Sequence, residues 1–87
     1  MFQEPRTDDK ENKMQTESIK ITTEYIKLDQ LIKFSGMAEN GAMAKDMILS
    51  EIVFVNGELC TMRGKKIRPG DNVKIEFEDE DFLIEVE

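Results

Sequence analysis

The sequence predicts an α+β domain in which two short helices pack on a small, mainly antiparallel curved sheet. Apolar residues first recur with helical spacing in two segments and then alternate with strand spacing towards the end of the chain. The length of 87 residues, with 36% charged and 39% hydrophobic side chains, suits one small domain. We expect this domain to span residues 18–87. Residues 1–17 are too polar to bury a core and are expected to form a disordered acidic and polar tail.

The first half of the domain is predicted to hold a strand and two helices. Residues 18–25, SIKITTEY, alternate as a half-buried strand does, with Ile19, Ile21 and Thr23 on the inner face. Residues 28–35 repeat apolar positions at helical spacing, and Gly36 is a stop signal.

The second helix is expected to begin at Asn40, a favourable N-cap residue, and to end near residues 50–51. Its apolar stripe consists of Ala44, Met47 and Ile48.

Strands dominate the second half. Residues 52–55 lead into the tight-turn signal Asn56-Gly57, and a return strand starts at residues 59–60. Residues 73–77 and 82–86 alternate, with Phe77 and Phe82 predicted inward, and the acidic residues 78–81 connect them as a hairpin. The predicted core consists of Leu31, Ile32, Met47, Ile48, Val53, Val55, Val73 and Ile75.

The charge distribution is uneven. The formal net charge is −7, and the last thirteen residues, 75–87, carry seven acidic and no basic side chains. Residues 27–74 carry eight basic and six acidic ones, and four of the basic ones crowd into a stretch of six residues: Arg63, Lys65, Lys66 and Arg68. Lysines and arginines on a short loop can reach several phosphates, and Gly64 allows a close approach to the backbone. An ordinary solvated loop is the alternative, and we favour binding of a polyanion.

The sequence offers little for catalysis. It has no His, few serines and no phosphate-binding glycine motif, and Cys60 is its single cysteine. The acidic residues 78–81 have the wrong span for a calcium loop, and Cys60 is best interpreted as a small buried hydrophobe. We therefore expect no enzymatic activity, no metal, no cofactor and no small-molecule substrate. No apolar stretch is long enough to span a membrane and no export signal precedes the domain, so we expect a cytoplasmic protein with no membrane partner.

The order of residues resembles the RNA-binding domain first named for bacterial small-subunit ribosomal protein four, the S-four domain. The resemblance runs through Lys27-Leu28-Asp29, Ala44-Lys45, the Val53-to-Gly57 hairpin and the Gly70-to-Val73 turn and strand. Residues 41–45 are most similar to the small stand-alone YaaA-like members. The resemblance covers about 50 residues and implies binding of structured RNA, ribosomal or transfer, in ribosome assembly or translation.

The site implied by the basic loop and the resemblance has one wall on the loop and another on the helix pair. Its residues are Lys27, Lys33, Asn40, Gly41, Lys45, Phe54, Arg63, Lys65, Lys66 and Arg68. Two positions depart from the family pattern. The second helix opens with Asn40-Gly41 in place of Ser-Arg, so a phosphate-binding Arg is missing, although the helix N–H groups can still receive a phosphate. Phe54 stands where the family often has a polar residue, and it either stacks on a base or covers the other sheet face.

Two alternatives remain open. The same fold with a degraded RNA face serves as an adaptor that binds a ribosomal or other protein. A ubiquitin-like sulfur carrier also contains such hairpins and turns, but carriers end in Gly-Gly and this sequence ends in residues 85–87, Glu-Val-Glu. We rank this second alternative low.

Overall fold

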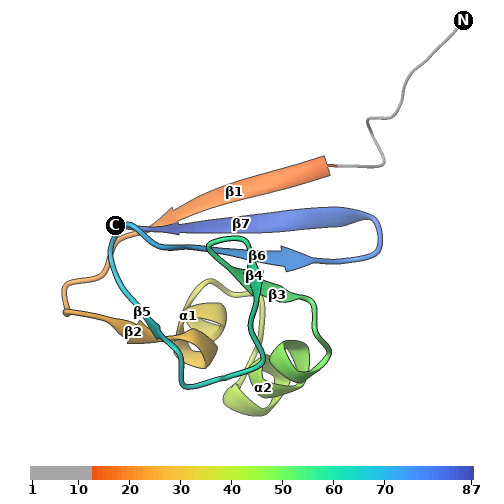
Figure 1. The fold of residues 1–87 in the computed structure, drawn as a ribbon, viewed down its shortest axis with the longest axis horizontal. Coiled ribbons are helices and arrows are strands. Elements are labelled where there is room, and N and C mark those ends of the chain that lie inside the picture. Colours follow the sequence, from red (N-terminus) through yellow and green to blue (C-terminus); the bar gives the residue numbers. More distant parts are fainter. Residues whose placement is uncertain (1–12) are drawn as a thin grey trace, which may run out of the picture.

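The computed structural model describes residues 13–87, which form two helices on one face of a five-stranded sheet (Figure 1). The elements in chain order are β1 (Lys13–Ile19), β2 (Ile26–Lys27), α1 (Leu28–Phe34), α2 (Gly41–Leu49), β3 (Val53–Val55), β4 (Glu58–Leu59), β5 (Lys66–Ile67), β6 (Asn72–Glu76) and β7 (Glu80–Val86). The main sheet has the order β1-β7-β6-β3-β4, and β2 and β5 form a separate two-stranded ribbon. The predicted α+β class is confirmed. No helix within residues 13–87 has the length and apolarity needed to cross a membrane.

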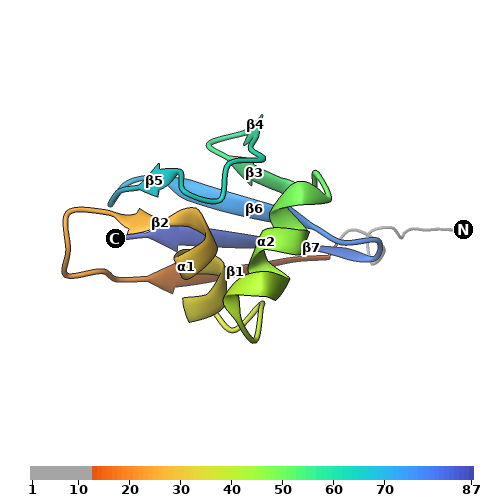
Figure 2. The same cartoon turned by 90° about the horizontal axis from the view of Figure 1, so that it is seen from below.

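The core lies between the sheet and the two helices, which lie across the same face of the sheet (Figure 2). All eight predicted core residues are buried, and Ile19, Leu28, Ala38, Ala44, Ile67, Ile84 and Val86 join them. The alternation of β3 explains this placement, because Val53 and Val55 face the helices and Phe54 faces away. The apolar periodicity of the sequence therefore locates the core correctly.

The turns that the sequence predicts also form. Asn56 and Gly57 take φ values of 52° and 88°, the left-handed conformation that a two-residue hairpin turn requires. Asn40 caps α2, since its side-chain oxygen accepts a hydrogen bond from the Met43 N–H at 2.9 Å. Helix α1 ends at Phe34, and the chain turns away at Gly36 with φ of 88°.

The first strand differs from the prediction. It begins at Lys13 rather than Ser18 and ends at Ile19, so residues 13–17 are part of a strand and not of a disordered tail. The remainder of the predicted tail, residues 1–12, lies outside the described residues. β1 pairs in parallel with β7, and residues 14–18 are exposed. Strand β1 is held by backbone pairing with β7 rather than by burial of its side chains. Its sequence therefore shows no apolar alternation from which the strand could be predicted. Beyond Ile19 the expected strand gives way to a loop in which Thr23 is exposed.

Two further expectations are corrected. Strands β2 and β5 were not predicted, because two residues each are too few to show a period. Phe77 was expected to point inward, but it lies after the end of β6 and is 38% exposed. Its ring meets the edge of Phe82 in a T-shaped contact with centroids 5.7 Å apart.

Candidate nucleic-acid interface

The segment between β4 and β6, residues 60–71, carries the cluster of basic residues, and we call its part from residue 60 to 68 the cationic loop. The loop leaves the sheet after β4 and runs along the helix side of the molecule to β5 (Figures 1 and 2). It turns tightly at residues 63–64, where the Lys65 N–H donates to the Met62 carbonyl at 3.1 Å. Gly64 has no left-handed φ, and a Cβ added there meets no atom within 4 Å. The fold itself therefore does not require glycine at this position.

The cationic loop is fixed to the start of α1. The N–H groups of Leu28 and Asp29 donate to the carbonyls of Lys65 and Arg63, at 2.9 and 3.1 Å. The first N–H groups of a helix have no partner inside the helix, and the N-cap residue Lys27 provides no side-chain cap. The carbonyls of the loop satisfy these donors instead. The basic side chains of the loop are thereby held beside the start of α1.

The short ribbon of β2 and β5 adds a second connection. Lys27 and Lys66 are direct partners across this antiparallel pair. Lys66 also places its Nζ 4.9 Å from the centroid of the Tyr25 ring, within the range of a cation–π contact. We call Lys27, Arg63, Lys65 and Lys66 the cationic shelf. All four side chains are exposed, and none forms an ion pair with a carboxylate of residues 14–87.

Two like charges directly opposite each other on a pair of strands are unfavourable. Because both side chains are exposed, solvent and salt weaken this repulsion, and an anion nearby would weaken it further. One carboxylate lies close by in sequence, Asp29 in the first turn of α1, where it interacts favourably with the helix dipole. Its Oδ1 is buried and has no hydrogen-bond partner among the described groups.

The far end of the loop is tied to the sheet by Asp71. The Arg68 N–H donates to Asp71 Oδ2 at 2.8 Å, and the Asn56 side-chain amide donates to Asp71 Oδ1 at 3.1 Å. The Arg68 N–H first, then the Asn56 amide and the positive charges of Arg68 and Lys65, lower the pKa of Asp71 below its ordinary value, against a weaker opposing effect of burial. The side chain of Arg68 is exposed beyond β5, at the other end of the strand from the Lys27 pairing.

The remaining predicted site residues lie on other elements. Asn40 and Gly41 form the start of α2, and Lys45 is exposed in the middle of that helix, which packs beside α1. Lys33 is exposed near the end of α1 and lines a different hollow, together with residues 20–23, Ile26, Gln30 and Phe34. The structure brings Lys27 together with the loop, and it leaves Lys33 and the residues of α2 on neighbouring surfaces.

Phe54 lies on the sheet face away from the helices. It is half-buried, and Lys74, its partner on β6, places its Nζ 5.7 Å from the ring centroid. Because Val53 and Val55 are buried against the helices, Phe54 and the cationic loop are on opposite sides of the sheet. The position agrees with the alternative that Phe54 covers the other sheet face.

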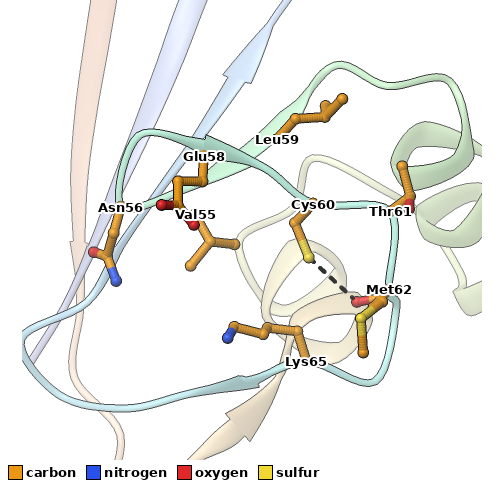
Figure 3. Close-up of a pocket in the computed structure, with 8 residues that line it drawn as sticks. All are labelled: Val55, Asn56, Glu58, Leu59, Cys60, Thr61, Met62 and Lys65. Atoms are coloured by element: carbon orange, nitrogen blue, oxygen red, sulfur yellow. Dashed lines mark hydrogen bonds between the residues drawn. The ribbon is translucent and has the colours of Figure 1, made fainter.

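A pocket that the sequence did not reveal lies between the β3–β4 hairpin and the cationic loop (Figure 3). Its volume is about 400 Å³, and its lining consists of Val55, Asn56, Glu58, Leu59, Cys60, Thr61, Met62 and Lys65. Glu58 lies on β4 and Lys65 on the cationic loop. The sequence does not show that these two segments face each other, so the shared pocket is visible only in the structure. Cys60, which the sequence analysis interpreted as a small buried hydrophobe, is only half-buried and lines this pocket.

Comparison with known proteins identifies the family to which the chain belongs. The family model described as S4 domain matches residues 19–85, and the chain belongs to this S4 domain family. The resemblance noted from the sequence is thus confirmed. The chain is similar to a protein of Bacillus subtilis (strain 168) named probable ribosome maturation protein RlbA, with 41% identity over 58 residues, or 67% of this chain and 82% of that protein. It is also similar to Hemolysin A of Brachyspira hyodysenteriae, with 36% identity over 50 residues, or 58% of this chain. This match spans 21% of Hemolysin A.

Proposed function

We propose that the protein binds structured RNA, ribosomal or transfer, through the cationic shelf, and that it acts without catalysing a reaction, in ribosome assembly or translation in the cytoplasm. The observation that carries the proposal is the direct pairing of Lys27 with Lys66 beside the loop carrying Arg63 and Lys65. The four exposed cations lie on the loop and on the β2 residue paired with it, where backbone hydrogen bonds fix the loop to α1. Phosphate groups are the ligands that such a rigid cationic surface attracts, since each phosphate bound releases counterions.

The comparisons support the same proposal. The S4 domain match covers the shelf and the loop, and the RlbA relative carries the name of a ribosome maturation protein. The open space at Gly64 allows a phosphate to approach the loop backbone. Asn40, Gly41 and Lys45 of α2, with Lys33 and Arg68, are proposed to extend the interface to neighbouring phosphates.

The test is a salt titration of RNA affinity. A variant with Arg63→Ala, Lys65→Ala and Lys66→Ala should stay folded, because the substituted side chains are exposed. It should bind a structured ribosomal RNA fragment more weakly. The slope of log K against log salt should shrink by roughly 0.7 to 0.9 for each phosphate that the variant no longer neutralises. Lys74→Ala, which removes a cation from the opposite sheet face, is the matched control and should leave the affinity and the slope unchanged.

A second candidate function is that of an adaptor for a protein, and the outer sheet face favours it. On that face Phe54, Lys74 and Leu83 follow one another across β3, β6 and β7. In the part of the chain that the structure describes, no helix covers this side of the sheet (Figure 1). Retention of wild-type affinity and salt slope by the folded triple variant would contradict the RNA proposal and leave the adaptor as the better account.

A further inference from the structure

The pocket between the β3–β4 hairpin and the cationic loop has the size of a small-ligand site. Its volume of about 400 Å³ lies in the range of roughly 300 to 1,000 Å³ that such sites occupy. Lys65 belongs both to the pocket lining and to the cationic shelf. A polymer whose charged backbone lies on the shelf therefore passes directly beside the pocket, so one of its side groups can enter it.

Two charged groups of opposite sign give the pocket its polarity. Glu58 reaches in from the hairpin and Lys65 from the loop, and both side chains point towards the space between them (Figure 3). No ion pair joins the two within the described chain. A carboxylate only accepts hydrogen bonds and an ammonium group only donates them. A ligand that fits both must present donors next to an acceptor.

The Asn56 side chain lines the pocket, but its polar atoms are already hydrogen-bonded within the protein and are not free to recognise a ligand. Its side-chain amide donates to Asp71, and its side-chain oxygen accepts from the Asn72 N–H at 3.0 Å. These bonds fix the hairpin end of the pocket. The pocket is therefore shaped before a ligand arrives, which reduces the entropic cost of binding.

Apart from Thr61, the rest of the lining is apolar, and two of its residues contain sulfur. Cys60 is half-buried, and its thiol donates to the Met62 carbonyl with 3.7 Å between sulfur and oxygen. The Met62 side chain is 66% exposed, so it can contact a ligand that enters the pocket. Thioethers make favourable contacts with aromatic rings. A flat aromatic ligand therefore suits this exposed surface.

From these groups we infer that the pocket receives one unpaired guanine base of the bound RNA. Guanine presents two adjacent donors, N1–H and the N2 amino group, which the Glu58 carboxylate accepts side by side, and the neighbouring O6 accepts from Lys65. Cytosine, adenine and uracil each offer a carboxylate only one donor group on that edge, an amino group in the first two and N3–H in uracil. The same edge is engaged in a base pair within a duplex, so the base must come from a loop or a bulge. The inference rests on the proposed RNA-binding function and adds a base preference to it.

The test compares two RNA hairpins that differ at one unpaired position in the loop, guanosine in one and inosine in the other. Inosine keeps N1–H and O6 but lacks the N2 amino group. Fluorescence anisotropy gives the affinity of each RNA for the wild type, for Glu58→Ala and for the control Glu85→Ala. Both variants lose one negative charge, and Glu85 is exposed on β7, away from the pocket.

We expect the wild type and Glu85→Ala to bind the guanosine hairpin at least about fivefold more tightly than the inosine hairpin. Glu58→Ala should bind the two hairpins equally while keeping the salt slope of the wild type. Salt-dependent binding without discrimination in the wild type, or discrimination that persists in Glu58→Ala, would overturn the pocket assignment and leave the shelf intact. Absence of RNA binding altogether would overturn the function and the pocket together.

Discussion

Asn56 and Asp71 join the two tight turns that flank the cationic loop. The Asn56 amide donates to Asp71 Oδ1, while the other carboxylate oxygen, Oδ2, accepts from the Arg68 N–H. The backbone adds a bond from the Asn56 N–H to the Asn72 carbonyl at 2.9 Å. The two ends of the loop are thus held together at its base. This explains structurally why an Asn-Gly turn and a Gly-Asp turn occur together in the sequence.

The first prediction follows from the charge of Asp71. Its pKa is lowered in the folded protein by the Arg68 N–H and then by the Asn56 amide. A lowered pKa means that the stabilisation is present above the ordinary value near 3.8 and is lost as the pH falls through the folded value. Urea denaturation gives the free energy of unfolding at each pH. The decrease in this free energy on acidification should be smaller for Asp71→Asn than for the wild type, because the variant has no carboxylate to protonate at position 71. Asp46→Asn, at an exposed position on α2, is the control and should follow the wild type. Identical pH profiles for Asp71→Asn and wild type would refute a stabilising role of the hydrogen bonds that Asp71 accepts from Arg68 and Asn56.

The second prediction concerns the core. Leu31 and Ile48 are fully buried, one on each helix. Truncation of either to Ala removes buried methyl groups and leaves a cavity, so the free energy of unfolding should fall by about 2 to 5 kcal/mol. Leu49→Ala is a matched control, because Leu49 is next to Ile48 on α2 but 56% exposed, and it should change stability by less than about 0.5 kcal/mol. Chemical denaturation measures all three. Equal losses for Ile48→Ala and Leu49→Ala would contradict the assigned helix face.

The helices and the core could be predicted because their signal is local. Apolar side chains at helical spacing, a capping Asn40 and alternation in β3 are all visible within a few residues of one another. The strand β1 lacked such a signal, because residues 14–18 are exposed and are held by backbone pairing to β7 at the other end of the chain. Long-range pairing of a polar strand leaves no periodicity in the sequence.

For the candidate site, too, local features could be predicted from the sequence and long-range contacts could not. The charges of the cationic loop are visible in the sequence, and the loop was singled out from them. The opposition of Lys27 and Lys66, and the pocket shared by Glu58 and Lys65, depend on contacts between distant segments. Alternation along β3 predicts that the Phe54 side chain points to the opposite side from Val53 and Val55. Which of the two sides the helices cover depends on the whole fold and could not be predicted from this segment.

The third prediction separates the two faces of the sheet. Phe54→Ala should leave the affinity for RNA unchanged, because the side chain lies on the face opposite to the cationic loop, beneath Lys74. Some loss of stability is expected, since Phe54 is half-buried. RNA affinity and denaturation are measured on the same preparation, with Lys66→Ala as the variant that should weaken binding. Weaker RNA binding by folded Phe54→Ala, with an unchanged salt slope, would instead indicate that a base stacks on its ring.

The last prediction uses the pairing of Lys27 with Lys66. A carboxylate at position 27 stands directly opposite Lys66 and at the N-cap of α1, where negative charge is favourable. Lys27→Glu should therefore raise the free energy of unfolding at low salt by about 0.5 to 1 kcal/mol, and the gain should shrink as salt screens the pair. The same change removes a phosphate-binding cation and adds repulsion, so RNA affinity should fall. Lys27→Gln, which removes the charge without reversing it, should fall between wild type and Lys27→Glu in both measurements. Thermal melts at low and high salt, together with anisotropy titrations, provide the comparison. A Lys27→Glu protein that is less stable at low salt, or that binds RNA as tightly as the wild type, would show that Lys27 and Lys66 do not form a strained cationic surface for RNA.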